Sequence, residues 1–159
     1  MNKKDILQKL IESLRGLLEA GTRAARASGE AATDPDSKAE NKYDTRNLEA
    51  SYLARGQAFR VAETMEALRE IEVFRPRAFA ADEAIAMGAL VTISGRDGKF
   101  RCLLCPAAGG TEVTVHGEEV LIITPSSPLA AKLSGRKKGD RVEMQPGRPA
   151  SVAAIVGVE

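Results

Sequence analysis

The sequence contains no tryptophan, and aromatic residues make up only 4% of its 159 residues. Proteins that hold single-stranded nucleic acid by base stacking need exposed aromatic rings, so this composition argues against such a surface. No apolar run approaches the roughly 20 residues of a membrane-spanning helix. The N-terminus, MNKKDILQKLIESL, is charged and periodic, unlike a signal peptide. We therefore expect no membrane partner.

Cysteine, histidine and net charge are also scarce. Two cysteines without a secretory signal favour a reducing cytoplasm, and a net charge of +1 gives no general attraction to nucleic acid. Cys102 and Cys105 have the spacing of a metal or redox pair. Residues three apart on a strand point to opposite faces, however, so we expect buried or edge thiols. The single histidine, His116, precedes Gly117 and is expected in a turn, which makes a Ser-His-Asp or Cys-His catalytic constellation improbable.

Proline is nearly absent from the first half of the chain. Residues 3–72 contain only Pro35 and are rich in Leu, Ala, Glu, Lys and Arg, which favour helix. From about residue 73, Val, Ile, Thr, Gly and Pro become frequent, and alternating runs such as ALVTIS and EVTVH indicate strands. The sequence thus predicts an α+β protein, with a helical hairpin over 1–73, a linker over 74–80 and a β-rich domain over 81–159.

Small and apolar residues of the first arm follow the alternating three- and four-residue steps of a coiled-coil seam. They are Leu7, Leu10, Leu14, Leu17, Gly21, Ala24, Ser28 and Ala31, broadened by Ile11, Leu18, Ala25 and Ala32. The corresponding residues of the second arm are Ser51, Ala54, Ala58, Val61, Met65 and Leu68. Side chains shrink along the first arm and grow along the second, so antiparallel pairing matches them in size. Pro35 ends the first helix, because it lacks an N–H and clashes with the preceding turn. The arms, each about 30 residues, would extend roughly 45 Å at 1.5 Å per residue.

The predicted bend carries a cluster of carboxylates: Asp34, Asp36, Glu40 and Asp44. Helix capping accounts for Asp34 and Asp36, because acids are favoured at a helix N-terminus. A solvated charged face is a second interpretation, supported by Lys38, Lys42 and Arg46. A third is delivery of carboxylates to a metal site on another molecule, since Mg²⁺ often uses only one or two protein carboxylates. Spacing alone does not choose among the three.

The second half is predicted to contain strands near 88–95, 99–105, 111–116, 118–124, 140–144 and 150–158 and a helix near 128–134. Ser127 suits the N-cap of this helix, Pro128 its first position and Gly135 its end. Leu129 and Leu133 are expected to bury against the sheet. A plain cap is one interpretation of Ser127-Pro128. The run Arg136-Lys137-Lys138 is interpreted as a solvated loop, with docking on an acidic surface or near nucleic acid as the alternative.

One segment of this half, VLIITPSSPLAAKLSGRKKGDRVEM, resembles the C-terminal domain of the bacterial Gre (GreA/GreB) transcript-cleavage factors. In that family a strand leads into a Ser-Pro-Leu turn, a short helix, a Gly-Lys pair and a Gly-Asp that opens the next strand. Here these are residues 127–129, the helix through Leu133, Gly135-Arg136 and Gly139-Asp140. Glu40-Asn41 followed by Tyr43 resembles the family's acidic Glu-Asn-x-x-Tyr stretch with one residue fewer. The tip and the CLLCPAAGG segment are similar to a divergent Gre-like branch.

The resemblance implies an FKBP-like C-terminal domain: a twisted antiparallel sheet with a short helix packed on it. It implies a cytoplasmic, monomeric elongation factor that docks on bacterial RNA polymerase at the rim of the secondary channel. The turn at Ser126, Ser127 and Pro128 would make this contact, and Asn41 and Tyr43 would orient the tip or touch polymerase.

The resemblance also implies chemistry at the tip. Asp36 and Glu40, with Asp34 and Asp44 in reserve, would help polymerase hold Mg²⁺, and cleavage of backtracked nascent RNA would be stimulated. The chain alone would bind no cofactor and would not be an enzyme. An alternative is a regulator that occupies the channel without cleavage. More distant alternatives are a self-associating adaptor and an FKBP-like prolyl isomerase or chaperone. The isomerase needs an aromatic-lined pocket, whereas the second half contains only Phe74, Phe79 and Phe100.

Overall fold

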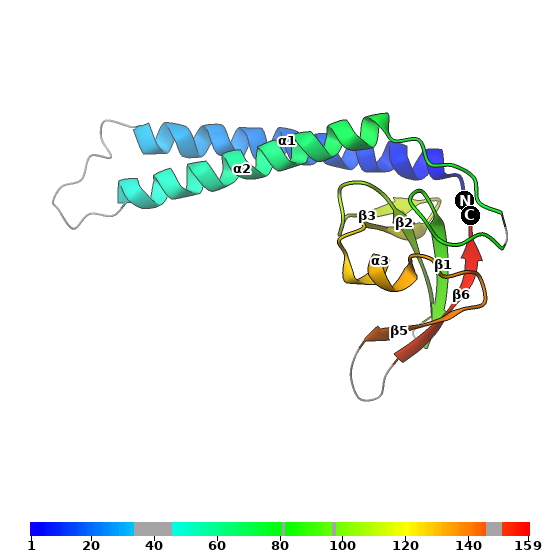
Figure 1. Ribbon diagram of the computed structural model, residues 1–159. Coiled ribbons are helices and arrows are strands. Elements are labelled where there is room, and N and C mark those ends of the chain that lie inside the picture. The colour runs from blue at the N-terminus through cyan, green and yellow to red at the C-terminus, as the bar shows by residue number, and fades with distance from the viewer. Residues whose placement is uncertain (34–45, 81, 97, 146–150) are drawn as a thin grey trace. The chain divides into compact units, whose positions relative to one another are not determined.

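The computed structural model describes residues 1–33, 46–80, 82–96, 98–145 and 151–159. Two long helices are followed by a mixed sheet and a short helix, which confirms the predicted α+β class (Figure 1). The helices are α1 (Lys3–Thr33), α2 (Arg46–Val73) and α3 (Pro128–Leu133). The strands are β1 (Leu90–Gly95), β2 (Gly98–Leu104), β3 (Glu112–Val115), β4 (Glu118–Ile123), β5 (Arg141–Gln145) and β6 (Ser151–Val158). The chain divides into two compact units, Glu12–Leu68 and Met1–Ile11 with Arg69–Glu159.

Within the unit Glu12–Leu68, the two helices pair in the predicted antiparallel sense. Leu14 of α1 and Leu68 of α2 are both buried. Further along, Gly21 lies against Val61: a Cβ on the glycine would sit 3.1 Å from Val61 Cγ2. Large side chains therefore share one level of the hairpin, and a glycine faces valine at another, which is the size matching that antiparallel pairing requires.

Two predicted seam residues of α1, Leu17 and Ala24, border the groove between the helices and are not buried in it. Leu17 is 56% exposed and Ala24 is exposed, whereas Leu18 and Ala25 are half-buried. In an α-helix that keeps 3.6 residues per turn, a seven-residue repeat drifts by about 20° per heptad. The position one residue later therefore moves into the contact stripe as the helix proceeds away from Leu14.

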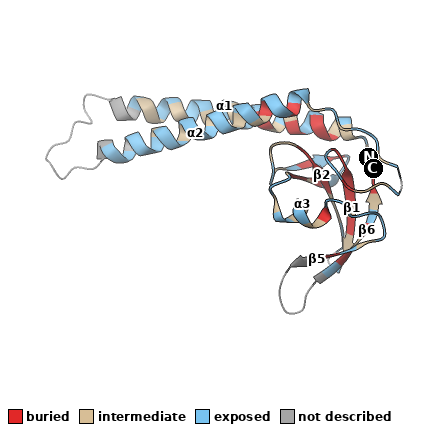
Figure 2. Cartoon of the chain, in the orientation of Figure 1, coloured by how far each residue is buried: buried red, intermediate tan, exposed pale blue. Residues whose placement is uncertain are grey.

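The predicted seam of α2 is right at Ala54, Val61 and Leu68 and wrong at the other three positions. Ser51, Ala58 and Met65 are exposed, whereas the polar Gln57 and Thr64 are half-buried. The prediction favoured small or apolar residues, but the buried pair of Leu68 and Ile71 sets the phase of the helix. Thr64 and Gln57 precede Ile71 by one and two seven-residue repeats, so they fall on the same stripe of the helix. Figure 2 shows that, among the described side chains of α1 and α2, the buried ones lie in the N-terminal part of α1 and the C-terminal part of α2.

The six strands form one sheet in the order β3-β4-β2-β1-β6-β5. All neighbours are antiparallel except β2 and β4, so the sheet is mixed, and the expectation of a purely antiparallel sheet is wrong. The chain reverses between β3 and β4, and β4 lies between β3 and β2, so β4 runs parallel to β2. Val120, Ile122 and Ile123 of β4 are all buried, so β4 takes an inner place beside β2. β3 alternates buried Val113 and Val115 with exposed residues and takes the edge.

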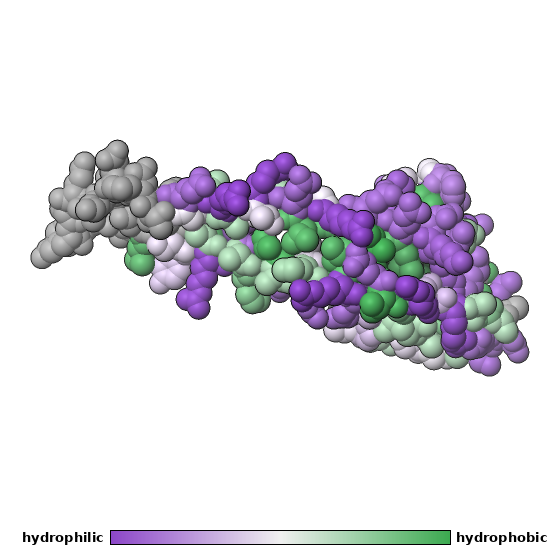
Figure 3. All heavy atoms as spheres, turned by 90° about the horizontal axis from the view of Figure 1, so that it is seen from above, coloured by the Kyte–Doolittle hydropathy of each residue, from purple (hydrophilic) through white to green (hydrophobic). Residues whose placement is uncertain are grey.

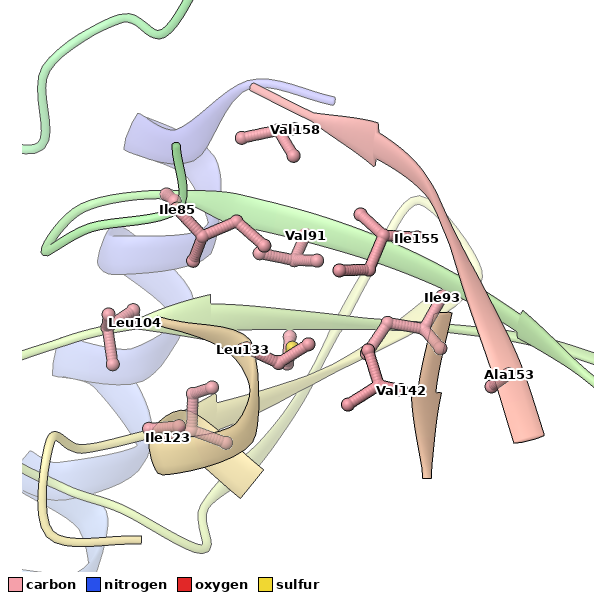
Figure 4. Packing of buried hydrophobic residues seen from close by; sticks show 13 residues of the cluster. Ile85, Val91, Ile93, Leu104, Ile123, Leu133, Val142, Ala153, Ile155 and Val158 are labelled. Carbon is pink, nitrogen blue, oxygen red and sulfur yellow. The ribbon is translucent and has the colours of Figure 1, made fainter. Parts of the chain in front are cut away.

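A cluster of buried side chains lies between one face of the sheet and α3 (Figure 4). Ala130 and Leu133 of α3 are completely buried, and Leu129 is partly buried against the same cluster. Leu133 therefore behaves as predicted, and Leu129 does so in part. The strands and the loop before β1 contribute the other buried members: Ile85, Ala89, Val91, Ile93, Cys102, Leu104, Ile123, Val142, Ala153, Ile155 and Val158.

The segment between α2 and β1 is tied to the first turn of α1. The ammonium of Lys3 donates to the carbonyl of Gly88 at 2.9 Å and lies 4.8 Å from the centroid of the Phe79 ring. The guanidinium of Arg77 lies 4.0 Å from the same centroid and pairs with Glu83. Burial lowers the pKa of Lys3 from its ordinary value. Two cations on one ring hold this segment in place.

His116 lies in a two-residue turn between β3 and β4, as predicted. Its φ of 53° and the 80° of Gly117 give the two positive values that a type I′ hairpin turn requires. Its Nε2 lies 3.5 Å from a carboxylate oxygen of Asp5.

Candidate functional site

The predicted docking turn begins where β4 ends. The backbone N–H of Ser127 donates to the carbonyl of Thr124 at 2.8 Å, which closes a four-residue turn through Pro125 and Ser126. Proline at the second position of such a turn is favoured because its ring fixes φ near the required value. The chain is thus reversed between β4 and α3 by local chemistry.

Ser127 caps α3 as predicted. Its φ and ψ are −75° and 143°, and its Oγ accepts a hydrogen bond from the N–H of Ala130 at 3.1 Å. Pro128 occupies the first turn of the helix, and Gly135 follows it with φ 79°. The side chain of Ser127 therefore already serves the fold, whereas Ser126 and Pro128 are exposed. The exposed pair is the part of the turn that is free for a partner.

Thr124 is a residue of this site that the sequence analysis did not single out. Its Oγ1 lies 3.1 Å from the Oγ of Ser126, so the two hydroxyls share a hydrogen bond. The signal in the sequence was the TPSS segment, in which a hydroxyl precedes the turn-forming proline. The sequence alone did not show that the Thr124 hydroxyl would contact the hydroxyl of Ser126.

An open pocket of about 360 Å³ adjoins the turn. Most of its surface is apolar, and its lining consists of Gly110, Leu121, Ile122, Ile123, Ser127, Pro128, Leu129 and Lys132. The ammonium of Lys132 donates to the carbonyl of Glu143 at 2.9 Å. None of these lining residues is aromatic, which argues against the aromatic-lined pocket that a prolyl isomerase of the FKBP type needs.

The basic run after α3 has an ordered backbone and exposed side chains. The carbonyl of Arg136 accepts from Ile85 N–H at 2.8 Å, and Lys137 N–H donates to the Asp140 carboxylate at 2.9 Å. The side chains of Arg136, Lys137 and Lys138 are all exposed. This agrees with the solvated loop that was predicted.

Cys102 and Cys105 are both buried and free, as expected. Burial raises the pKa of each thiol to about 12, so both are neutral at physiological pH. In the part of the chain that the structure describes, no three His, Cys, Asp or Glu side chains lie close enough together to hold a metal ion. No described helix is long and apolar enough to cross a membrane.

The acids of the predicted tip lie outside the described residues. These are Asp34, Asp36, Glu40 and Asp44, and the same holds for Asn41 and Tyr43. Helix α1 ends before these residues, at Thr33, and helix α2 begins after them, at Arg46. The roles of the tip residues stay predictions.

Two of the solved structures to which the chain is similar carry the name Gfh1. GreA factor homolog 1 (Gfh1) of Thermus thermophilus matches with a TM-score of 0.38 and 18% identity, over 94% of this chain and 94% of that one. Gfh1 of Thermus aquaticus matches with a TM-score of 0.36 and 17% identity over 92% of each chain.

A third similar structure is a prokaryotic transcription elongation factor GreA/GreB from Nitrosomonas europaea. It matches with a TM-score of 0.34 and 20% identity, over 74% of this chain and 94% of that one. No protein-family model and no curated protein sequence matches the chain.

Proposed function

We propose that this chain is a Gre-like transcription factor that binds bacterial RNA polymerase through its C-terminal domain. One observation carries the proposal: the Gre-like segment folds into a capped turn whose Ser126 and Pro128 are exposed. The turn therefore presents the residues that the resemblance assigns to docking, while Ser127 holds α3. The antiparallel hairpin of α1 and α2 in the same chain supports the proposal.

The turn is suited to binding because it is rigid before a partner arrives. A hydrogen-bonded turn, a proline and an N-cap restrict it, so little conformational entropy is lost on association. The apolar pocket beside it can take a side chain of the partner, and buried anchors of this kind carry much of the energy of an interface. Loss of Pro128 or Ser126 should therefore weaken binding more than it weakens the fold.

The hairpin would enter the secondary channel of polymerase. The helices α1 and α2 contain 31 and 28 residues. Close approach of the helices at Gly21 and Val61 keeps the hairpin thin at that level. Its narrow cross-section and its acidic bend are the two features that this role requires.

Asp36 and Glu40, with Asp34 and Asp44 in reserve, would contribute carboxylates to a Mg²⁺ site completed by polymerase. The donor set fits this ion, because carboxylate oxygens are its preferred protein ligands. This ion would be the second Mg²⁺ of the polymerase active centre, and the two metals would supply activation of water and stabilisation of the leaving oxygen during hydrolysis of backtracked RNA. A pair of solvent-exposed carboxylates holds Mg²⁺ weakly, so the chain alone should be neither a metalloprotein nor an enzyme.

The test has two stages. In the first, the full chain is mixed with core polymerase at micromolar concentration, and failure to bind would overturn the proposal. In the second, cleavage of nascent RNA is measured in backtracked complexes with wild type, Asp36→Ala and Glu40→Ala. Cleavage should be stimulated by wild type and lost in both variants while binding persists.

A matched control for the second stage is Glu19→Ala. This carboxylate lies on the exposed face of α1, where it pairs with Arg23 at 3.6 Å. Such a surface pair contributes only about 0.3–0.5 kcal/mol, so removing it should change neither folding nor cleavage. Tight binding by wild type without any stimulation would instead support the alternative of a channel-occupying regulator.

A further inference from the structure

We propose that Thr124 is a positioning residue of the docking turn, held by the Cys105–Gly110 loop and acting through the hydroxyl of Ser126. The inference rests on the proposed function, because it concerns the surface through which the chain would bind polymerase. It adds the Cys105–Gly110 loop, which lies outside the Gre-like segment, to the parts of the chain that support docking.

Thr124 controls the turn with both its backbone and its side chain. Its carbonyl accepts from Ser127 N–H at 2.8 Å, and its Oγ1 lies 3.1 Å from Ser126 Oγ. Ser126 is exposed, and an exposed serine hydroxyl ordinarily rotates among staggered positions. The bond to Thr124 selects one of these positions before any partner binds.

The Cys105–Gly110 loop fixes Thr124 from behind. A Cβ on Gly109 would lie 2.9 Å from Thr124 Oγ1 and 3.0 Å from its Cγ2. These distances are too short for nonbonded atoms, so an added Cβ would displace the threonine side chain. The φ of Gly109 is not in the left-handed range, and the missing side chain is therefore the reason for glycine here.

The same loop is itself firmly held. Gly110 N–H donates to the Ile122 carbonyl at 2.8 Å, and Cys105 N–H donates to the Ile123 carbonyl at 2.9 Å. Ala108 adopts a φ of 62°, a left-handed conformation that costs an ordinary residue about 1–2 kcal/mol. Such strain persists where the surroundings determine the backbone, and here both bonds anchor the loop to the end of β4.

These contacts form a continuous path from Gly109 through Thr124 to Ser126. Its expected effect is preorganisation: a hydroxyl already fixed in the bound orientation loses less entropy on association. Removing one neutral hydrogen bond should weaken polymerase binding by about three- to tenfold.

The experiment measures the dissociation constant for core polymerase at fixed salt for wild type, Thr124→Val, Thr124→Ser and Ser126→Ala. Valine keeps the shape of threonine but loses the hydroxyl, whereas serine keeps the hydroxyl. Thr124→Val should weaken binding, Ser126→Ala should weaken it at least as much because it removes the hydroxyl itself, and Thr124→Ser should bind close to wild type. The double variant should be no weaker than Ser126→Ala alone, because Thr124 acts through Ser126.

Two controls separate positioning from general destabilisation. Thr114→Val removes a hydroxyl from an exposed threonine of β3 and should leave binding unchanged. Thermal unfolding should show Thr124→Val folded at the assay temperature. Gly109→Ala is a second route to the same effect: its methyl group should displace Thr124 and weaken binding, while Gly95→Ala, whose Cβ would meet Ala153 Cβ at 3.4 Å, should not.

The free protein supplies a reading that does not depend on polymerase. The Hα–Hβ coupling constants of Ser126 should report one χ1 rotamer in wild type and an average of rotamers in Thr124→Val. Averaged couplings in wild type, or wild-type binding by Thr124→Val, would overturn the inference. If wild type itself does not bind polymerase, the proposed function fails, and the couplings alone decide whether Thr124 positions Ser126.

Discussion

Two glycines of α1 provide a matched test of how closely the hairpin helices approach. At Gly16 an added Cβ would meet nothing within 4 Å, whereas at Gly21 it would lie 3.1 Å from Val61 Cγ2. Alanine is favoured over glycine inside a helix by about 0.8–1.0 kcal/mol. Gly16→Ala should therefore raise the free energy of unfolding by about 1 kcal/mol, because nothing opposes this gain.

Gly21→Ala receives the same gain in helix propensity but must separate crowded atoms. Carbon atoms prefer to lie about 3.5–4.0 Å apart, so the helices or Val61 must shift by a few tenths of an ångström. Overpacking of this kind typically costs about 1–3 kcal/mol. We expect Gly21→Ala to be neutral or destabilising, and at least about 1 kcal/mol less stable than Gly16→Ala.

Urea unfolding followed by circular dichroism measures the difference as a shift in midpoint at unchanged slope. The double variant Gly21→Ala/Val61→Ala supplies the control, since removing the opposing methyl groups should make the alanine at position 21 favourable again. If Gly21→Ala stabilised the chain as much as Gly16→Ala does, the helices would not be in close contact at this level. The size-matching argument for antiparallel pairing would then lose its main support.

Two further predictions concern the C-terminal domain. Ser127→Ala removes the acceptor for Ala130 N–H and should cost about 1 kcal/mol, whereas Ser127→Asp keeps a capping oxygen and should cost less. Thermal unfolding of both variants tests this, and equal losses would exclude a capping role. Burial raises the pKa of the Cys102 and Cys105 thiols to about 12, above that of an unfolded cysteine near 8.5. Their contribution is complete below about pH 8.5 and should be lost as pH rises toward 12, by about 1.4 kcal/mol per pH unit for each thiol. Between these pH values, the free energy of unfolding should therefore fall more steeply for wild type than for a variant with alanine at both positions. Identical pH dependence of the two proteins would contradict this prediction.

Several large apolar side chains of the hairpin are exposed, because the contact between two helices buries few residues. Leu17 and Leu53 are each 56% exposed, and Phe59 is 65% exposed. Figure 3 shows apolar surface along the hairpin between charged side chains. With small residues in the seam, two helices alone cannot cover the larger apolar ones, so most buried area of the chain lies elsewhere.

Local signals in the sequence determined most of the second half. Alternating apolar runs located the strands to within a few residues, because each strand buries one face or both against the core. Ser127, Pro128 and Gly135 located α3, since capping and termination depend on backbone groups that are neighbours in the chain. His116-Gly117 identified its turn for the same reason. The capped part of the candidate site was therefore predictable, and the tip acids lie beyond the described residues.

Partners far apart in the chain were decided only by the tertiary structure. The buried Ile71 adds Gln57 and Thr64 to the contact stripe of α2, although polar residues are not expected in a helix seam. The parallel pairing of β2 and β4 depends on which strand of the β3–β4 hairpin lies beside β2, and neither strand's own sequence determines this. Gly109 and Thr124 are 15 positions apart, and their contact arises because the loop after β2 returns along the end of β4. The sequence by itself determined what each segment becomes, because local propensity and capping act within a few residues; packing between segments decided which side chains meet.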